Sequence, residues 1–146
     1  MYSRRSLDHW IDSELVHEKE CLTVVMIDLD RFKIINDTMG HNAGDAILIS
    51  FGSIVKTILR TEDIAIRYGG DEFLLVLRKS DETVAQAVMN RLEEALQSFS
   101  FRGLVVSVSW GLSTLVPPAT RQDFEQAVHS ADAAMYRMKK NSRQEV

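Results

Sequence analysis

The sequence lacks the features that would place it in several special classes of protein. It has one cysteine, Cys21, which excludes an internal disulfide and fits a reducing compartment. No stretch reaches the roughly 18 consecutive apolar residues that cross a membrane, and no apolar run follows the arginines of MYSRRSLDHW, so we expect neither a membrane span nor a signal peptide. Internal repeats and low-complexity tracts are also absent.

The charge balance excludes further classes of partner. The formal net charge is -4, which gives no electrostatic argument for binding nucleic acid or an anionic membrane surface.

An apolar content of 45% can support a core, and 146 residues are the usual size of one domain. We therefore expect residues 1–146 to form a single domain, cut from a longer protein.

Apolar residues at helical spacing predict several helices. The expected ranges are Ser6–Glu18, the later part of the segment 36–63, Asp81–Ser98, and Arg121 to about Asn141. In the segment 36–63 the stretch NDTMGH is expected to be a loop, and the apolar stripe of the helix after it begins at Ile47. The two prolines, Pro117 and Pro118, break the chain before the last helix.

Runs of β-branched and apolar residues predict strands between these helices. They are expected from Leu22 into Asp28 and Asp30, over Ile64–Tyr68, over Phe73–Leu77, and over Leu104–Leu112. A glycine pair joins the second strand to the third, which is a hairpin signal. Strands interleaved with helices in this order predict an α/β (α+β) sandwich with a mixed sheet.

Acidic residues stand where two of these apolar strands end. Asp28 follows one strand and Asp71 lies in the hairpin turn, so the two carboxylates meet if the strands are neighbours. Like charges held together favour a bound cation, and carboxylate oxygens at a strand edge suit Mg²⁺ with a phosphate substrate. Gly69 and Gly70 allow positive φ and close approach of a ligand. The alternative is an ordinary turn with solvated acids.

The segment RYGGDEF, with IDLDRFKIINDTMGHNAGDAIL ahead of it, resembles the GGDEF family of diguanylate cyclases. The likeness covers about Arg4 to Arg143. It implies a mostly antiparallel sheet flanked by helices, akin to the adenylate cyclase core and the polymerase palm. It also implies a reaction in which two GTP form cyclic di-GMP and two pyrophosphates across a homodimer of domains.

The resemblance assigns a metal site to the acidic cluster. It implies that Asp28 and Asp71 bind Mg²⁺ or Mn²⁺, with the carbonyl of Leu29 as a backbone ligand. Glu72 matches the second acid of the motif, which either assists the metal or accepts the proton of the ribose 3′-hydroxyl. The glycine pair would let GTP lie against the hairpin.

Other positions match nucleotide contacts of the family. Asn36 and Asp45 match guanine readers, and a carboxylate can accept hydrogen bonds from guanine groups that adenine lacks. The matches to phosphate contacts are Phe32, Lys33, Lys139 and Arg143. Taken alone, these residues favour structural readings. Asn36 reads as a loop residue, Asp45 as an acid in the first turn of a helix, and Lys139 and Arg143 as basic residues that stabilise the end of a helix. We expect His41 to be a structural part of the loop.

A second site follows from the same resemblance. Arg60 and Asp63 form an R-x-x-D motif before the glycine pair, and Arg91 lies on the following helix. They match the family's inhibitory site for cyclic di-GMP, because guanidinium groups can bind phosphate and guanine edges. Alone, R-x-x-D has no predictive value. The resemblance predicts product inhibition.

The sequence departs from the family pattern in three places. Ser3 stands where asparagine is usual and most of the opening motif is missing, Trp110 replaces a small aliphatic residue, and Ser142 stands where glycine is common. The domain is expected to be the C-terminal catalytic part of a bacterial cytoplasmic signalling protein whose sensor could lie in a membrane. The alternatives are a catalytically silent module that binds GTP or cyclic di-GMP, a cyclase that makes cyclic GMP-AMP or another dinucleotide, and a purely structural domain.

Overall fold

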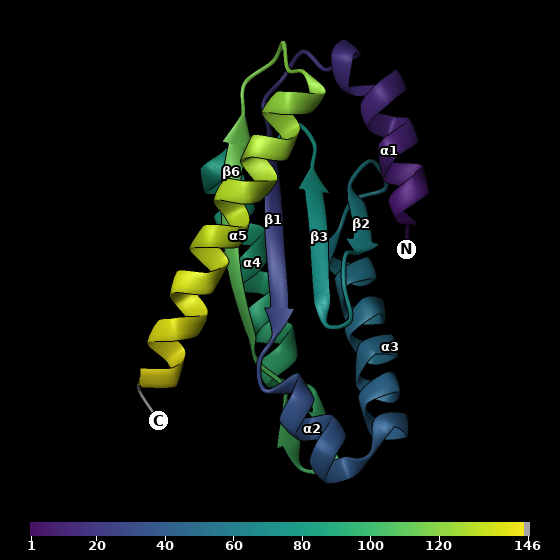
Figure 1. Ribbon diagram of the computed structural model, residues 1–146, viewed down its shortest axis with the longest axis vertical. Helices are drawn as coiled ribbons and strands as arrows, with labels where there is room; N and C mark the ends of the chain where they lie inside the picture. Colours follow the sequence, from purple (N-terminus) through teal and green to yellow (C-terminus); the bar gives the residue numbers. More distant parts are fainter. Residues whose placement is uncertain (145–146) are drawn as a thin grey trace.

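An antiparallel sheet with strand order β2-β3-β1-β6 forms the centre of the fold (Figure 1). The computed structural model describes the backbone of residues 1–144 and the side chains of residues 1–141. The strands of this sheet are β1 (Leu22–Leu29), β2 (Ile64–Arg67), β3 (Glu72–Leu77) and β6 (Val108–Leu115). A parallel bridge joins Tyr2 to Ile66. The predicted sandwich with a mostly antiparallel sheet is confirmed.

Helices cover both faces of this sheet. They are α1 (Arg4–Ser13), the 3-10 turn η1 (Leu15–His17), α2 (Phe32–Met39), α3 (His41–Ile58), α4 (Glu82–Gln97) and α5 (Arg121–Gln144). The helices α1 and α5 pack on one face, and α2, α3 and α4 pack on the other (Figure 1). None of the described helices is long and apolar enough to cross a membrane.

The central strand β1 is buried along its whole length. Val24 and Met26 face the α1–α5 side, whereas Val25 and Ile27 face the α3–α4 side, as the two-residue period of a strand requires. Both faces need apolar residues, which explains why LTVVMIDL reads as a continuous run rather than an alternation. The strand therefore carries Asp28 to the end of a covered sheet.

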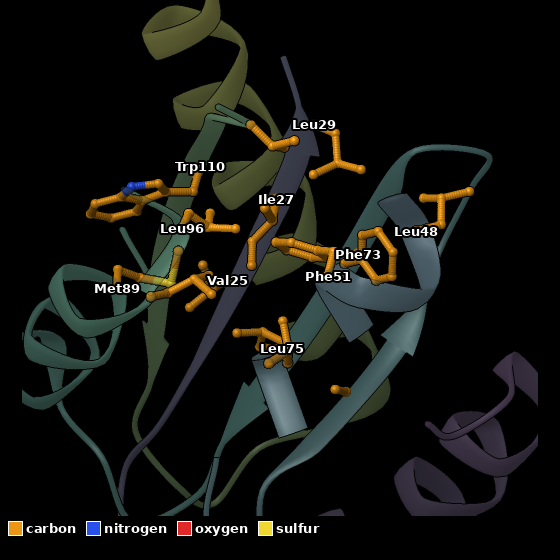
Figure 2. Close-up of a cluster of buried hydrophobic side chains, with 14 of the residues drawn as sticks. Val25, Ile27, Leu29, Leu48, Phe51, Phe73, Leu75, Met89, Leu96 and Trp110 are labelled. Atoms are coloured by element: carbon orange, nitrogen blue, oxygen red, sulfur yellow. The ribbon is translucent and has the colours of Figure 1, made fainter. Parts of the chain in front are cut away.

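Figure 2 shows the core on the α3–α4 side of the sheet. Phe51 of α3 packs on Phe73 of β3, with ring centroids 4.7 Å apart and planes tilted by 56°. Trp110 of β6 lies at the other end of this cluster, and its indole N–H donates to the carboxylate of Glu93. The aromatic ring at position 110 therefore fills the core, and its one polar group has a partner.

The helix α5 packs closely on β6 because Gly111 has no side chain. A Cβ atom at Gly111 would overlap the carbonyl oxygen of Ala131 and the backbone nitrogen of Met135. Ala131 and Met135 belong to the buried stripe of α5. The close contact holds α5 against the sheet, and Lys139 near its end reaches Asp28.

The loop predicted at NDTMGH is wrong. The structure has α2 there, and Gly40, with φ of +92°, separates it from α3. Asn36 and the residues after it have low intrinsic helix propensity, but burial of Phe32 and Ile35 on one side of α2 outweighs it. His41, predicted as a loop residue, is the first residue of α3.

Two further element boundaries differ from the prediction. The strand expected over Leu104–Leu112 is divided into β5 (Leu104–Val105), which pairs with β4 (Ser100–Phe101), and β6. The first helix begins at Arg4 rather than Ser6, because the Ser3 hydroxyl caps it by accepting from the backbone N–H of Ser6, and it ends in η1. The remaining predicted helices and strands lie where the periodicity indicated.

Candidate active site

The register between β1 and β3 brings the acids together. Asp28 stands opposite Glu72 in this pairing, and the backbone N–H of Leu29 donates to the carbonyl of Asp71 at 3.1 Å. Carboxylate oxygens of Asp28, Asp71 and Glu72 lie within 4.8 Å of one another. The predicted meeting of Asp28 and Asp71 is confirmed, and Glu72 joins them.

The turn between β2 and β3 is held by its own polar groups. The backbone N–H groups of Tyr68 and Gly69 donate to the carbonyl of Glu72 at 2.8 and 3.2 Å. The guanidinium of Arg67 donates to the carbonyl of Gly70 from Nε at 3.1 Å and from Nη2 at 2.7 Å. These bonds fix a turn that is otherwise open to solvent.

The glycine pair does not use the positive φ that glycine allows. Among the described glycines, positive φ occurs at Gly40 and Gly103 and not at Gly69 or Gly70. The connection runs over several residues, so it needs no left-handed backbone of the kind required by a two-residue turn. A Cβ atom at Gly70 would meet nothing within 4 Å, so this side of the turn is open to a large ligand.

The carboxylate of Asp28 is buried and carries an unusual charge environment. Its side chain is 9% exposed, and Lys139 Nζ lies 2.6 Å from its Oδ2 atom. Burial, together with the neighbouring charge of Asp71, raises the pKa of Asp28 to about 6 although Lys139 opposes the rise. Its other oxygen, Oδ1, is buried without a hydrogen-bond partner among the described residues.

The residues present fit a divalent cation. A buried carboxylate oxygen that lacks a partner is costly in the absence of a ligand. Three carboxylates that can each offer one oxygen within a small volume match the ligands that hard cations prefer. The structure therefore has an acidic cluster at which a cation would satisfy the free oxygen of Asp28 and relieve the repulsion between Asp28 and Asp71.

Glu72 differs from the other two acids in its surroundings. Burial raises its pKa most, followed by the negative charges of Asp132 and Asp71. Asp132 lies on α5, so an acidic residue from the far end of the sequence also acts on this cluster. The sequence analysis did not single out Asp132.

Asn36 and Asp45 stand on neighbouring helices. Asn36 lies in α2 and Asp45 in the first turns of α3. Gly44 makes this arrangement possible, because a Cβ atom there would overlap Oδ1 of Asn36. The carboxamide of Asn36 thus packs against α3 at Gly44, the residue before Asp45 in the sequence.

The predicted phosphate contacts are only partly assembled. Lys139 reaches the acidic cluster, whereas Lys33 is exposed on the first turn of α2, next to the buried ring of Phe32. The side chain of Arg143 lies outside the described residues. The departure at Ser142 lies outside them as well.

A groove of about 550 Å³ extends from the acidic cluster along α5. Asp28, Glu72 and Lys139 line one end of it. Its other polar lining residues come from one face of α5, and they are His129, Asp132, Tyr136 and Lys140. Their spacing of three or four residues is the signal in the sequence that could have revealed this face.

Asp30, the acid that follows β1, has a structural role. Its carboxylate accepts hydrogen bonds from the hydroxyls of Ser107 at 2.8 Å and Ser109 at 2.7 Å. Its backbone N–H donates to the carbonyl of Ser107. Asp30 therefore fastens the start of β6 to the end of β1 and is not among the carboxylates of the acidic cluster.

The R-x-x-D residues form a closed network. The Asp63 side chain is 2% exposed, and its carboxylate accepts from the backbone N–H of Arg60 and of Arg78 and from the Arg60 guanidinium. The same guanidinium also donates to the carbonyl of Arg78 and to the hydroxyl of Ser80. Arg91 donates to the carbonyl of Ile58 at 3.3 Å, so all three predicted residues gather at the end of α3.

Comparison with known proteins agrees with this architecture. Diguanylate cyclase A of Treponema denticola is 38% identical over 136 residues, which cover 88% of this chain and 35% of that protein. Diguanylate cyclase DosC of Escherichia coli (strain K12) is 33% identical over 154 aligned residues, which cover 100% of this chain and 33% of that protein. The chain thus spans about a third of the length of these curated relatives.

Solved structures and a family model give the same result. The GGDEF domain of YfiN, also called TpbB, from Pseudomonas aeruginosa has a TM-score of 0.83 and 30% identity, over 97% of this chain and 91% of that one. Diguanylate cyclase SiaD of the same organism, solved with its activator SiaC, has a TM-score of 0.85 and 30% identity, over 95% of this chain and 55% of that one. The model described as "Diguanylate cyclase, GGDEF domain" matches residues 1–145. The chain belongs to the GGDEF-domain family of diguanylate cyclases.

Proposed function

We propose that this domain condenses two GTP molecules into cyclic di-GMP and two pyrophosphates. The observation that supports this most is the cluster of Asp28, Asp71 and Glu72, in which a buried oxygen of Asp28 has no hydrogen-bond partner among the side chains that the structure describes. The two relatives described above are named diguanylate cyclases. We also propose that the domain is the C-terminal catalytic part of a longer signalling protein, because it spans about a third of these relatives.

Asp28 and Asp71, with the carbonyl of Leu29, would hold Mg²⁺ or Mn²⁺. A bound ion of this kind supplies positive charge that stabilises the charge developing on phosphate oxygens. Asn36 and Asp45 would bind the guanine base, because a carboxylate can accept from guanine N1–H and N2–H₂. Lys33, Lys139, Arg143 and the backbone at Phe32 would hold the triphosphate, and the open side of Gly69 and Gly70 would leave room for the nucleotide.

The reaction needs two nucleotides that face each other, and each domain offers one acidic cluster. We propose a homodimer in which each ribose 3′-oxygen bonds to the α-phosphorus of the nucleotide on the other chain. The bond from that phosphorus to the leaving pyrophosphate breaks, and the pyrophosphate keeps the electron pair. Glu72, which lies beside the two ligand carboxylates, accepts the proton of the 3′-hydroxyl. Positioning and charge supply the catalysis, without a covalent intermediate on the protein.

Product inhibition is the finer part of the proposal. Arg60 and Arg91 lie together at the end of α3, where their guanidinium groups could bind the phosphates of cyclic di-GMP. The carboxylate of Asp63 already has several donors. We infer that Asp63 acts mainly by holding Arg60, and that the two arginines make the principal contacts with the product.

A substrate test separates the cyclase from the alternatives. Concentrated protein with Mg²⁺ is offered GTP, ATP or both, and the products are identified by chromatography. Cyclic di-GMP from GTP alone supports the proposal. A mixed dinucleotide in the third reaction would point to a related cyclase, and binding of GTP without any product would point to a silent module.

A further inference from the structure

The proposal above assigns only the inner end of the groove along α5, at Asp28, Glu72 and Lys139. It begins at Asp28 and Glu72 and continues past Asp132, His129 and Tyr136. Its volume of about 550 Å³ is in the range of sites that bind small molecules. Asp28, whose Oδ1 atom is buried without a hydrogen-bond partner within residues 1–141, lines the inner end of the groove.

The nucleotide of the same chain leaves part of this groove free. Its base would lie at Asn36 and Asp45, on α2 and α3, which pack on one face of the sheet. The groove is built from α5, which packs on the opposite face. Figure 1 shows α5 and α3 on different sides of β1, with the end of β1 between them. The triphosphate of that nucleotide would meet α5 at Lys139, which leaves open the part of the groove lined by His129, Asp132 and Tyr136.

The polar groups of the groove match a ribose. Glu72 and Asp132 are carboxylates that line the same groove. A carboxylate only accepts hydrogen bonds, and each hydroxyl of a vicinal diol can donate one. Bonds from a hydroxyl to a carboxylate are short and strong. Two carboxylates that line one groove thus offer acceptors for the 2′- and 3′-hydroxyls of a sugar bound there.

An aromatic side chain stands further along the same face. Tyr136 is 63% exposed, which is unusual for a large aromatic residue on a helix that otherwise buries its apolar groups. It lies one helical turn after Asp132 and lines the same groove. An exposed ring beside a sugar site can stack on a base, because every base has a π face.

We propose that this groove receives the ribose of the nucleotide held by the partner chain. Asp132 accepts a hydrogen bond from the 2′-hydroxyl of that ribose, and the adjacent 3′-hydroxyl faces Glu72. Tyr136 packs on the partner's nucleotide. The inference rests on the proposed function and extends it, because it assigns to α5 the recognition of the attacking nucleotide.

The test compares GTP with 2′-deoxy-GTP in the wild type and in Asp132→Asn. Wild type should lose roughly 10- to 100-fold in cyclisation rate with the deoxy substrate, since a hydrogen bond to a charged group is lost. Asp132→Asn should lose a similar factor with GTP and show almost no further loss with 2′-deoxy-GTP. Equal deoxy effects in the two proteins would overturn the inference.

A binding measurement assigns the effect to the partner's nucleotide. Calorimetry with a non-hydrolysable GTP analogue and Mg²⁺, at protein concentrations too low for dimers, should give the same affinity for wild type and Asp132→Asn. A matching loss of affinity would mean that Asp132 serves the nucleotide of its own chain, and the inference would be wrong. Glu125→Gln, an exposed carboxylate of α5 outside the groove, is the matched control and should behave as wild type.

The outcome for the proposed function is separate. If wild type makes no cyclic dinucleotide from GTP, the proposed function fails whatever the variant does. If wild type makes cyclic di-GMP and Asp132→Asn makes it at the same rate with both substrates, the proposed function stands and the assignment of α5 fails.

Discussion

Lys139 Nζ lies 2.6 Å from Oδ2 of Asp28, and the Oδ1 atom of the same carboxylate is buried without a hydrogen-bond partner among the described residues. The contact joins α5 to the end of β1. A cation bound at Oδ1 of Asp28 would lie near the ammonium group of Lys139, and the two positive charges would repel each other. The position of Lys139 and the binding of a cation are therefore linked.

Lys139→Met should strengthen the binding of Mg²⁺ in the absence of nucleotide by roughly fivefold, since about 1 kcal/mol of charge repulsion is removed. The same variant should bind a non-hydrolysable GTP analogue at least about tenfold more weakly, because a phosphate contact is lost. Calorimetry measures both. Arg137→Met, on an exposed position of α5, should change neither. Weaker Mg²⁺ binding by Lys139→Met would contradict the link.

Asp28→Asn and Asp30→Asn should differ, although the residues are two positions apart. Asp28→Asn should lower cyclic di-GMP formation by at least about 100-fold, since a carboxylate ligand of the cation is lost. It should also abolish the rise in melting temperature on adding Mg²⁺, which follows from selective binding to the folded state.

Asp30→Asn should leave that Mg²⁺-dependent rise in place. It should instead lower the free energy of unfolding by about 1–3 kcal/mol, because the hydroxyls of Ser107 and Ser109 lose a charged acceptor. Thermal unfolding with and without Mg²⁺ measures the rise in melting temperature, and urea unfolding measures the free energy of unfolding. A normal response to Mg²⁺ in Asp28→Asn would refute the assignment of the metal site.

Gly44→Ala should weaken GTP binding by at least about tenfold, because the added Cβ displaces the carboxamide of Asn36 from its place against α3. Isothermal calorimetry with GTP and ATP analogues measures the loss and any change in selectivity. Gly52→Ala in the same helix is the control, since its Cβ would meet only the end of Met1 at 3.3 Å. Unchanged GTP affinity in Gly44→Ala would show that Asn36 does not read the base.

Arg91→Ala should reduce inhibition by added cyclic di-GMP without destabilising the fold. Among the described residues its guanidinium makes one hydrogen bond, a long one to the carbonyl of Ile58. Arg60→Ala should lower the free energy of unfolding by about 1–3 kcal/mol, since the buried carboxylate of Asp63 loses its charged partner. Inhibition assays and urea unfolding separate the two effects. Full inhibition in a folded Arg91→Ala variant would exclude this arginine from the product site.

The acidic cluster could be predicted from the sequence because its geometry follows from strand pairing. Once β1 and β3 are antiparallel neighbours, the end of one meets the turn before the other, so Asp28 and Asp71 must be close. The helical spacing of apolar residues from Ile47 onwards also predicted α3, the helix that carries Asp45. The spacing between RYGGDEF and the motif ahead of it then indicated the GGDEF family.

Features that depend on distant packing could not be predicted in this way. The helix α2 forms where local propensity favours a loop, because the sheet buries Phe32 and Ile35. In the sequence, Asp30 stands two residues after the candidate metal ligand Asp28. In the fold its carboxylate is instead bonded by the hydroxyls of Ser107 and Ser109, which lie far from it in the sequence. The sequence marks Asp132 only by the spacing of polar residues along α5, and the packing of α5 on the sheet brings it into the same groove as Glu72.

The most direct test of the central claim is product formation by three proteins, wild type, Asp71→Ala and Asp71→Glu, with GTP and Mg²⁺ over a range of protein concentrations. Wild type should form cyclic di-GMP at a rate that rises faster than linearly with concentration, because each product needs two chains. Asp71→Ala should form none, and Asp71→Glu should keep part of the activity, because it keeps a carboxylate. Equal product from wild type and Asp71→Ala, or a strictly linear rate in the dilute range, would contradict the account.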